Sequence, residues 1–441
     1  MSIKSNIKKI IPKKLLNLRH LWYAWYGAYK YAFPSEDLLV IGITGTSGKS
    51  STTYFLRQML EANGFKVGSL STIDFYVGGE NKLNDQKMTM LGKYKIQKYL
   101  REMVDKKCDI AIVETTSEGA VQYRHRFINY DMMLLTNLYP EHIDSHGSFE
   151  NYKGAKLGIF EYVARCKRKI LQDKRLQPLH DDCCDKIQKT AIVNATSEYA
   201  QEFLQYPFER KCTFGDNIQN IFSDKSGLHF EINNKKFDAP LYGEHNIFNI
   251  AAALVVLHQL DIPLDHAQSS VAKLKGPEGR LEFISETEKF GFQAIVDYAF
   301  EPVAIDKLYG VVEKLQPKRV IHVFGSTGGG RDLSRRFSVG EYVGNHADIC
   351  IITDEDPYDD EPMQIINDVA GAVAKTGKTE GENLFKILNR TEAIEKAVQI
   401  AQAGDLILVT GKGSEQGMIV KGKMIPWDDR VTLRAALKNR K

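Results

Sequence analysis

Apolar and polar positions follow two alternating periods after residue 37, which predicts strands that alternate with helices. Short apolar runs typical of buried strands are separated by stretches with apolar positions three or four residues apart. The first predicted strands are 38–43, 67–71, 109–114 and 132–136, and the first predicted helices are 49–63, 149–164 and 246–260. This order is typical of an α/β protein with a parallel sheet built from crossover units.

The pattern changes between Cys212 and Tyr242, where short alternating runs broken by turn residues predict antiparallel hairpins at the edge of the sheet. Glycine and proline at 275–279 then mark a boundary. Beyond it a second series appears, with strands predicted at 294–297, 320–324, 349–353, 385–388 and 406–410 and helices near 302–315, 334–346, 362–374 and 391–403. We therefore expect three parts: an N-terminal helix in 1–37, a central domain over 38–276, and a doubly wound, Rossmann-like domain over 277–441.

The first 37 residues have a different pattern, with one basic and one aromatic set of positions. Apolar residues recur at helical spacing, which predicts an amphipathic helix that ends at Phe33-Pro34. The basic residues are Lys4, Lys8, Lys9, Lys13, Lys14 and Arg19, and the apolar ones are Ile11, Leu15, Leu18, Trp22, Trp25, Tyr26 and Tyr29. Two interpretations stay open: the apolar face lies on an anionic membrane, or it packs onto the body of the protein.

Composition excludes several classes of protein. The chain of 441 residues is 43% hydrophobic and 26% charged, which is ordinary for a globular protein of two or three domains. A net charge of +3 argues against a bulk nucleic-acid binder. The six cysteines show no metal-binding spacing, and the chain has no window apolar enough for a membrane span. We expect a cytoplasmic monomer with reduced thiols, in peripheral contact with the inner membrane face if the helix binds lipid.

The most informative segment is Val40–Thr53, an apolar strand followed by a glycine turn and a Lys-Ser pair at a helix start. Gly45 and Gly48 allow backbone N–H groups to approach a polyphosphate, and the helix adds its positive N-terminal end. Lys49 is then placed to pair with the outer phosphates, and the Ser50 hydroxyl to ligate Mg²⁺. The upstream glycine, Gly42, is one residue too far for the strict P-loop spacing, so an ordinary strand-to-helix turn is the alternative.

Polar residues follow other predicted strands, where ligands of open α/β sheets bind. Glu114 ends one strand, and His142 lies in the segment that follows the strand at 132–136. Glu114 is placed to hold a metal ion that Ser50 also touches, and His142 could supply a further ligand. The alternative for a glutamate at a strand end is a helix cap or a surface charge.

Seven ordered blocks across residues 40–417 carry a resemblance to a known family. They are T-G-T-S-G-K-S-S from 44, V-E-T-T-S-E-G from 113, T-N-L-Y-P-E-H-I-D-S-H-G-S-F-E-N-Y-K-G-A-K from 136, G-E-H-N-I-F-N-I-A-A-A from 243, G-P-E-G-R-L-E from 276, V-D-Y-A-F-E-P from 296 and V-T-G-K-G-S-E-Q from 409. Together they resemble the Mur ligase family, and within it the tripeptide synthetases.

The resemblance implies ATP- and Mg²⁺-dependent amide formation, in which a carboxylate of a muropeptide acceptor becomes an acyl phosphate that an amino acid's amine attacks. It implies nucleotide contacts at Gly45, Thr46, Ser47, Gly48, Lys49, Ser50, Ser51, Asn246, Asn249, Arg280 and Asp297. It implies metal ligands at Ser50, Glu114, His142 and a carbamylated Lys156. The catalytic residues implied are Lys49, His142, Lys156 and Arg280. Arg280 begins the last domain, so we expect that domain to close over the nucleotide.

The segment 353–362 corresponds to the loop that selects the amino acid in this family. Enzymes that add meso-diaminopimelate carry D-N-P-R there, whereas Tyr358 occupies the place of the arginine in this chain. A guanidinium that could bind a second carboxylate is therefore absent. The acidic residues of the loop are Asp354, Glu355, Asp356, Asp359, Asp360 and Glu361. They suit a cationic side chain such as lysine or ornithine, unless they only face water.

Other substrate contacts are expected at Thr89, Thr116, Ser117, Asp356, Tyr358 and Glu415. Three departures from the family stand out: only some 37 residues precede the phosphate loop, Phe300 and Ser414 replace family histidines, and only Thr89 and Gly92 persist in the substrate loop at 88–92. The first departure suggests the hypothesis of a membrane-anchored or differently carried muropeptide. Folylpolyglutamate, poly-γ-glutamate or cyanophycin-type ligases are an alternative, and a non-catalytic nucleotide-binding protein is another.

Overall fold

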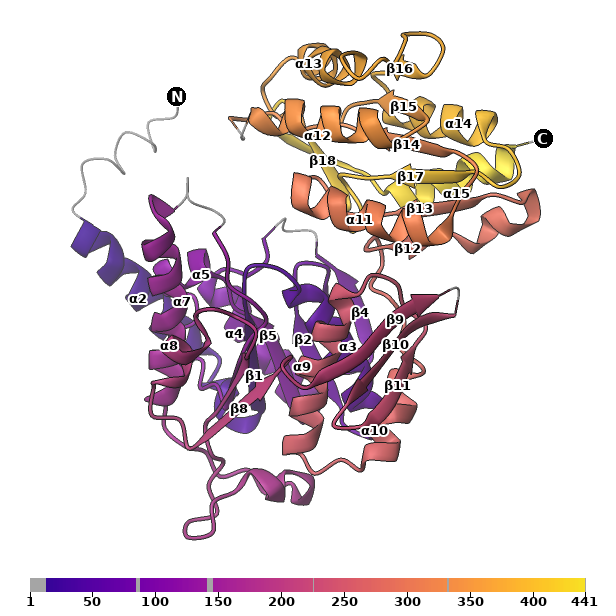
Figure 1. Cartoon of the computed structure of the whole chain (residues 1–441). Helices are drawn as coiled ribbons and strands as arrows, with labels where there is room; N and C mark the ends of the chain where they lie inside the picture. The colour runs from indigo at the N-terminus through magenta and orange to yellow at the C-terminus, as the bar shows by residue number, and fades with distance from the viewer. Residues whose placement is uncertain (1–12, 85–87, 141–145, 225, 331–332, 441) are drawn as a thin grey trace. The chain divides into compact units, whose positions relative to one another are not determined.

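The computed structural model describes residues 13–84, 88–140, 146–224, 226–330 and 333–440, and the side chains of 13–17 and 83 lie outside this description. The chain forms two compact units (Figure 1). The N-terminal unit comprises residues up to 222 together with 227–275, and the C-terminal unit comprises 223–226 and 276–441. Each unit is an α/β fold around its own sheet, as the sequence predicts.

The main sheet of the N-terminal unit has eight strands in the order β4-β3-β2-β5-β1-β6-β7-β8. Its strands are β1 Leu39–Thr44, β2 Val67–Leu70, β3 Asp74–Val77, β4 Glu80–Leu83, β5 Ile110–Glu114, β6 Met132–Leu135, β7 Thr190–Asn194 and β8 Arg210–Phe214. The strands from β2 to β8 in this order are parallel, and β3 and β4 form an antiparallel hairpin at one edge. The central strand β1 lies between β5 and β6, so the loop after it opens at the carboxyl edge of the sheet.

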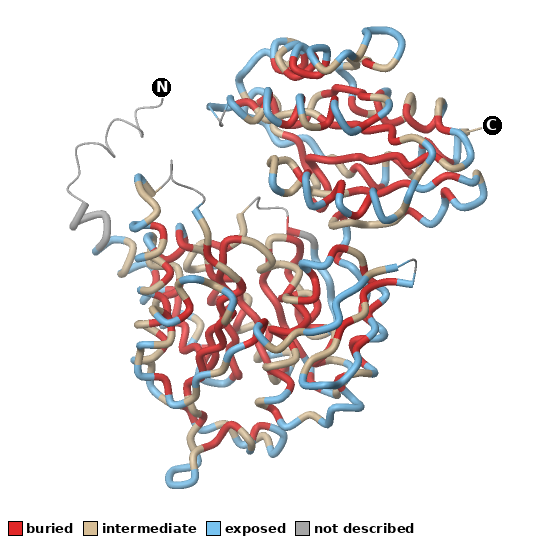
Figure 2. The backbone as a smooth tube through the Cα atoms, in the orientation of Figure 1, coloured by how far each residue is buried: buried red, intermediate tan, exposed pale blue. Residues whose placement is uncertain are grey.

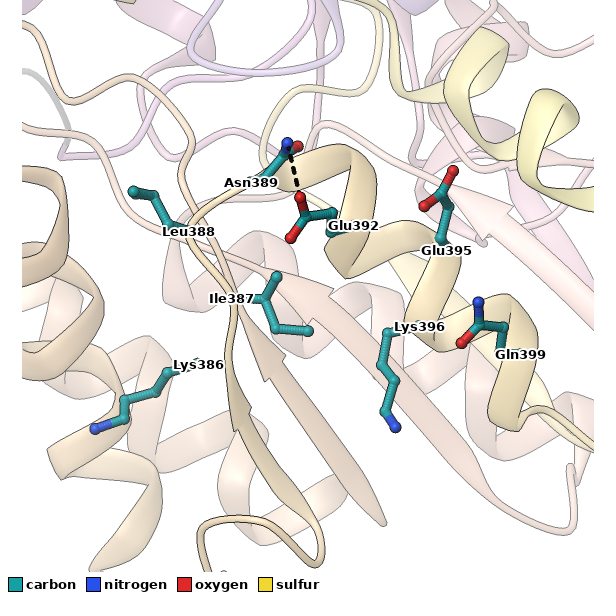
Figure 3. Close-up of a pocket in the computed structure, with 8 residues that line it drawn as sticks. All are labelled: Lys386, Ile387, Leu388, Asn389, Glu392, Glu395, Lys396 and Gln399. Carbon is teal, nitrogen blue, oxygen red and sulfur yellow. Dashed lines mark hydrogen bonds between the residues drawn. The ribbon is translucent and has the colours of Figure 1, made fainter.

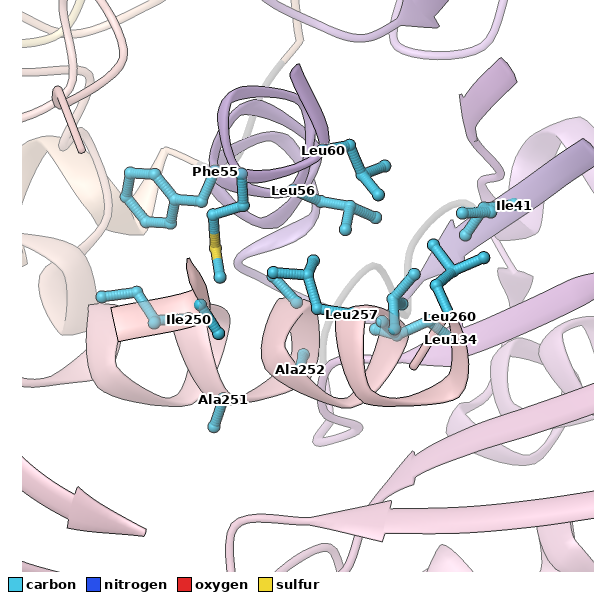
Figure 4. Close-up of a cluster of buried hydrophobic side chains, with 14 of the residues drawn as sticks. Ile41, Phe55, Leu56, Leu60, Leu134, Ile250, Ala251, Ala252, Leu257 and Leu260 are labelled. Atoms are coloured by element: carbon cyan, nitrogen blue, oxygen red, sulfur yellow. The ribbon is translucent and has the colours of Figure 1, made fainter. Parts of the chain in front are cut away.

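Helices cover both faces of this sheet because alternate side chains of the buried strands point to opposite faces. Ile41 and its neighbours at odd positions of β1 pack against α3 and α9, which lie side by side (Figure 4). Val40 packs on the other face with α4 and α7. The helices of the unit are α2 Lys13–Lys30, α3 Lys49–Ala62, α4 Lys93–Asp105, α5 Ser117–Val121, α7 Phe149–Ala164, α8 Ala200–Leu204, α9 His245–Gln259 and α10 Leu264–Val271, with 3₁₀ turns η1 Pro34–Asp37 and η2 Lys174–Leu179.

The hairpins predicted between residues 212 and 242 are present, but their expected position at the edge of the main sheet is wrong. Strands β9 Ile218–Asp224, β10 Gly227–Ile232 and β11 Lys235–Ala239 form a separate three-stranded sheet. Phe230 and Phe237, opposite each other on β10 and β11, stack with ring centroids 5.4 Å apart and join the core beside α9. The edge of the main sheet is instead β8, which pairs with β7 in parallel.

The C-terminal unit is a second sheet covered by helices on both faces. Its six strands have the order β12-β13-β17-β14-β15-β16, and all pairs are parallel except β12 with β13. The strands are β12 Glu282–Phe283, β13 Gln293–Val296, β14 Val320–Phe324, β15 Ile349–Ile352, β16 Leu384–Lys386 and β17 Leu406–Val409, followed by a hairpin of β18 Gly417–Val420 and β19 Lys423–Pro426. The helices are η3 Ser285–Phe290, α11 Pro302–Leu315, α12 Ser334–His346, α13 Pro362–Ala374, α14 Arg390–Ile400 and α15 Asp429–Asn439.

The N-terminal helix is present as α2, and its small residues, not its aromatic ones, contact the protein. Ala24, Gly27 and Ala28 are buried, whereas the aromatic side chains on the opposite face are exposed, as the pale blue stretches of α2 show (Figure 2). The alternative in which the aromatic face packs onto the body is therefore wrong for the described residues 18–30. Within the described part of the chain, no helix combines the length and apolar composition that crossing a bilayer requires.

Candidate active site

The turn between β1 and α3 has the backbone of a phosphate loop. Gly45 and Gly48 have positive φ angles of 149° and 78°, a conformation that favours glycine. A Cβ on Gly45 would lie 1.9 Å from Oγ1 of Thr136, so the close approach of these two segments also requires glycine there. Gly48 is the N-cap of α3 and contributes no side chain, which leaves the helix N-terminus available to an anion.

Side chains from two other elements hold this loop in place. Oγ1 of Thr136 donates to the Ser47 carbonyl at 2.6 Å, and Oδ1 of Asn137 accepts from the Ser47 N–H at 2.9 Å. From α7, the Tyr152 hydroxyl donates to Oγ1 of Thr46 at 3.0 Å. The loop is thus preorganised before any ligand binds, which lowers the entropic cost of binding.

Two lysines donate to the same carbonyl of the loop. Nζ of Lys49 donates to the carbonyls of Gly45 and Thr46, both at 2.9 Å. Nζ of Lys156, on α7, donates to the Gly45 carbonyl at 2.8 Å. The Lys156 residue is only 1% exposed, and its ammonium lies 4.6 Å from the Tyr152 ring centroid. Two cations therefore meet at the point where a phosphate loop holds its anion.

Glu114 is fully buried at the end of β5, beside the same loop. Its carboxylate accepts from the Thr72 N–H at 3.2 Å and the Thr72 hydroxyl at 3.1 Å. Burial raises the pKa of Glu114, while the Lys49 charge and a hydrogen bond from Ser50 oppose the increase. A buried carboxylate next to a serine hydroxyl is a suitable oxygen pair for Mg²⁺. The third predicted ligand, His142, lies outside the described residues.

The predicted substrate residues of the N-terminal unit lie around Glu114. Oγ1 of Thr72 lies at hydrogen-bond distance, 3.0 Å, from Oγ1 of Thr89, so Thr72 links Thr89 to the carboxylate. Thr116 caps α5 by accepting from the Gly119 N–H at 3.0 Å. Sequence reasoning missed Thr72, which has no motif of its own.

Sequence reasoning also missed His146, the second histidine of the block that begins at residue 136. Its Nε2 lies 3.1 Å from the Ser117 hydroxyl, and its ring lies 5.3 Å from that of Tyr152. Burial lowers the pKa of His146, with the Lys156 charge acting in the same direction. A neutral imidazole here can accept a proton or a hydrogen bond. The signal that could have found it is its spacing of four residues from His142.

Asn246 and Asn249 project from the first turns of α9 toward the start of α3. Oδ1 of Asn249 accepts from the Thr52 hydroxyl at 3.2 Å and lies 2.4 Å from where a Cβ on Gly48 would be. Nδ2 of Asn249 donates to Asn246 at 3.0 Å, and Asn246 donates to the Tyr242 carbonyl at 2.8 Å. The structure therefore brings Asn249 to the end of the phosphate loop with Asn246 hydrogen-bonded to it, and Ser51 lies in the first turn of α3.

In the C-terminal unit a charged cluster follows the ends of β13 and β17. Asp297 is half-buried, and its carboxylate accepts from the N–H groups of Leu281 at 2.6 Å and Ala299 at 2.7 Å. Burial raises the pKa of Asp297, and the charge of Arg280 opposes this. The Arg280 guanidinium lies 4.2 Å from the Tyr298 ring centroid, and its Nε is buried without a hydrogen-bond partner among the residues that the structure describes. Arg280 thus keeps donor capacity for an anionic ligand.

The residues predicted to bind the amino-acid substrate belong to the same charged cluster. The Tyr298 hydroxyl donates to Oε1 of Glu415 at 3.1 Å. Nζ of Lys412 donates to Oε2 of Glu415 at 2.6 Å and to Oδ2 of Asp356 at 2.8 Å. Two carboxylates therefore share one buried ammonium, which leaves the group net negative.

The acidic loop divides into a buried and an exposed part. Glu355 and Asp356 are buried, and burial raises the pKa of Glu355 to about 7. Asp359, Asp360 and Glu361 are exposed, and Asp360 pairs with Arg336 at 3.3 Å. For these three residues the interpretation as a cation pocket is not supported, because they face solvent. Tyr358 has a positive φ of 54°, and its ring lies against Gly329, where a Cβ would come within 2.7 Å.

Two other features are formed by different residues. A surface depression of about 720 Å³ runs between the end of β16 and α14 and is lined by Lys386, Leu388, Glu392 and Lys396 among others (Figure 3). The described residues include one tight group of metal-type side chains, Asp181, Cys183 and Cys184. Asp181 there accepts from Arg168 at 2.6 Å and from the Cys184 N–H at 3.0 Å, so its role is to close a turn.

Comparison with known proteins agrees with the geometry. Residues 43–257 match the Mur ligase middle domain, and residues 279–413 match the Mur ligase, glutamate ligase domain. A UDP-N-acetylmuramyl-tripeptide synthetase of Roseiflexus sp. is 31% identical over 97% of this chain and 83% of its own length. The protein of the same name from Borreliella burgdorferi is 32% identical over 92% of this chain and 78% of its own. A UDP-N-acetylmuramoyl-L-alanyl-D-glutamate–2,6-diaminopimelate ligase of Clostridium botulinum is 30% identical over 92% and 80%.

Solved structures support the fold. MurF from Acinetobacter baumannii has a TM-score of 0.66 at 17% identity, over 95% of this chain and 81% of that one. Mycobacterium tuberculosis folylpolyglutamate synthase has a TM-score of 0.66 at 15% identity, over 89% and 93%. At these identities the likeness concerns the fold alone. The two domain matches and the sequence relatives place the chain in the Mur ligase family of ATP-dependent, amide-forming ligases.

Proposed function

We propose that this chain joins an amino acid to the carboxylate of a muropeptide acceptor, as the third-residue ligases of peptidoglycan synthesis do. The observation that carries the proposal is the convergence of Lys49 and Lys156 on the Gly45 carbonyl, with the buried Glu114 beside Lys49 and Ser50. Transfer of a phosphoryl group to a carboxylate gathers several negative charges. A site that supplies fixed cations and a metal-binding carboxylate is suited to that chemistry.

Each predicted nucleotide or metal residue of the N-terminal unit then has a proposed role. When bound, ATP with Mg²⁺ supplies the phosphoryl group that activates the acceptor. The loop residues Gly45–Ser50 hold phosphate oxygens, with Ser50 and Glu114 as the metal's oxygen ligands. His142 remains a predicted ligand. Lys156, as a carbamate, would bring a further carboxylate to the metal site.

The remaining predicted contacts divide between the two units. We assign Asn246 and Asn249 to the nucleotide base, and Thr89, Thr116 and Ser117 to the acceptor; the position of Asn249 beside the start of α3 and the link from Thr89 through Thr72 toward Glu114 support these assignments. In the C-terminal unit, Arg280 and Asp297 are assigned to the nucleotide. His146 joins the acceptor group through Ser117.

We further propose a diamino acid such as lysine, in preference to meso-diaminopimelate, as the incoming substrate. Asp356 and Glu415 share Lys412 and leave a net negative group for a cationic side chain. Tyr358 offers no guanidinium for the second carboxylate of diaminopimelate. We assign Glu415 to the amino group of the incoming substrate, and the hydrogen bond from the Tyr298 hydroxyl to Glu415 supports a fixed orientation of its carboxylate. The thiols stay reduced and the reaction takes place in the cytoplasm.

Phosphate release from ATP tests the proposal directly. The purified chain is assayed with Mg²⁺, a panel of amino acids, and either UDP-MurNAc-dipeptide, its lipid-linked equivalent or a folate acceptor. We expect turnover with a muropeptide acceptor and lysine or ornithine, and none in Lys49→Ala. The proposal would be contradicted by turnover with the folate acceptor alone, or by the absence of turnover with every acceptor in the panel.

A further inference from the structure

α2 is held against the protein by residues that permit a close helix contact. A Cβ on Gly27 would lie 3.2 Å from the Cα of Tyr94, near the start of α4. Ala24 and Ala28 are 1% and 0% exposed on the same face. Small residues let the two backbones approach closely, so α2 is packed along α4 with a defined orientation.

Polar contacts strengthen this attachment at both ends of the helix. Nζ of Lys93 lies 3.0 Å from Nδ1 of His20. At the other end, Nε of Arg101 donates to the Tyr31 carbonyl at 3.0 Å, and the Tyr31 and Tyr94 rings meet edge to face at 5.1 Å. The rotation of α2 about its axis is therefore set, and so is the face that it turns away from the protein.

The outward face of α2 is a stripe of exposed aromatic side chains. Trp22 stacks on Tyr26 with ring centroids 5.3 Å apart, and Trp25 stacks on Tyr29 at 5.4 Å. The exposed fractions are 64% for Leu18, 53% for Trp22, 41% for Trp25, 39% for Tyr26 and 61% for Tyr29. Five large apolar residues in one exposed stripe form a patch that marks an interaction site in most proteins. We call these five residues the aromatic stripe.

Charge along the segment that carries the stripe is of one sign. Residues 1–35 contain six lysines and one arginine, and the first acidic residue of the chain is Glu36. Since the whole chain carries +3 and this stretch +7, the rest of the chain carries a net −4. The positive charge of the protein is thus concentrated on the segment that bears the aromatic stripe.

We propose that the aromatic stripe and its basic flanks bind the surface of an anionic lipid bilayer. Tryptophan and tyrosine, with an apolar ring and a polar tip, are the residues that favour the boundary between water and lipid. Lysine and arginine next to them attract anionic headgroups. A protein partner would need a complementary surface for rings that lie on a convex helix, whereas a bilayer accommodates such a helix lying in its plane.

Docking of α2 would orient a part of the proposed active site. Lys93, which contacts His20 of α2, directly follows the segment 88–92 that contains the acceptor residue Thr89. Lys93 therefore connects the membrane-facing helix to the substrate segment 88–92. This consequence rests on the proposed function, but binding itself does not, so the two can fail separately.

Sedimentation with vesicles tests the proposal without any enzyme assay. Full-length protein is mixed with vesicles of phosphatidylcholine alone or with phosphatidylglycerol added. We expect binding to the anionic vesicles that weakens with salt, and about a tenfold or greater loss in Trp22→Gln/Trp25→Gln. Phe337→Gln, which removes an equally exposed ring (48%) from α12, should bind as the native chain does. Equal partitioning of the native chain and the double variant would overturn the proposal.

Tryptophan fluorescence gives a second, independent readout. Only three tryptophans are present, and two of them, Trp22 and Trp25, lie in the stripe. Anionic vesicles should shift the emission to shorter wavelength, and brominated lipids should quench it. Unchanged emission would overturn the proposal, as would a dimer in gel filtration that the double variant abolishes while neither protein binds vesicles. Circular dichroism melts show whether the double variant is folded.

Discussion

Nζ of Lys156 lies 2.8 Å from the carbonyl oxygen of Gly45, a contact between residues 111 positions apart in the sequence. An ammonium that is 1% exposed loses most of its hydration, so it requires strong acceptors in compensation. The acceptor here is the phosphate loop itself. Lys156 thereby links α7 to the loop after β1, and a change at this residue affects the site and not the surface.

Lys156→Ala should reduce turnover by about a hundredfold or more, because it removes a cation or its carbamate from the centre of negative charge. If a carbamate acts there, acetate or formate should partly restore activity. Lys153→Ala is the matched control: Lys153 lies on the same helix but pairs with Glu202 at 3.1 Å near the surface, so its loss should change turnover little. Equal losses in the two variants would argue against a role for Lys156 at the site.

Glu114→Gln tests the metal site. The amide keeps the shape of the side chain but removes the negative charge that we propose as a Mg²⁺ ligand, so Mg²⁺-dependent nucleotide binding should weaken by about tenfold or more. Burial raises the pKa of Glu114, which means that burying the ionised carboxylate costs folding free energy. The melting temperature of the ligand-free variant should therefore not fall below that of the native chain. Isothermal titration at several Mg²⁺ concentrations measures the first effect. Glu118→Gln, an exposed neighbour, should leave both quantities unchanged.

The elements that the sequence predicted well are those whose pattern is local. β14 at Val320–Phe324 and α7 at Phe149–Ala164 have the bounds expected from an apolar run and from a helical period. The hairpin of β3 and β4 was not predicted, because β4, Glu80–Leu83, is largely polar and forms only by pairing with β3. β19 was not predicted either: Lys423–Pro426 has no alternation of buried and exposed positions, because it is exposed throughout, and it forms by pairing with β18.

Site residues follow the same rule. The phosphate loop could be read because its functional residues are consecutive, whereas the bond from Thr72 to Glu114 joins residues 42 positions apart. For α2, the helical period alone could not decide whether the aromatic face or the face with Ala24, Gly27 and Ala28 packs onto the protein. Close packing between helices favoured the small residues, and this outcome depends on the surface of α4.

Glu355→Gln should remove a pH dependence of stability. Burial raises the pKa of Glu355 from 4.5 to about 7, so the folded state keeps its proton where the unfolded state has lost it. The stability that this group contributes is therefore fully present below its unfolded-state pKa of 4.5 and is lost as the pH rises through its folded-state pKa of about 7. At about pH 8 the variant should be more stable by about 3 kcal/mol, and at about pH 4.5 the difference should fall below about 0.5 kcal/mol.

Urea unfolding at these two pH values measures the effect. Glu361→Gln is the control, because Glu361 belongs to the same loop but is exposed, and its substitution should give no such dependence. A Glu355→Gln chain that is less stable than the native chain at both pH values would mean that the ionised carboxylate is stabilised by Arg390 and Lys412, both of which act against the rise in pKa.

Tyr358→Arg tests the choice of amino acid. A guanidinium at this position can bind the second carboxylate of meso-diaminopimelate through two hydrogen bonds, which lysine lacks the group to accept. The ratio of kcat/KM for meso-diaminopimelate to that for lysine should rise about tenfold or more, as expected from one charge-assisted hydrogen-bonded contact. Position 358 has a φ of 54° with tyrosine, and arginine adds no further backbone strain there.

Tyr358→Gln removes the ring without adding a charge and should leave the ratio unchanged. If arginine and glutamine shift the ratio equally, the loss of the ring, and not the new cation, determines selection, and the assignment of this loop to the substrate's far end is wrong.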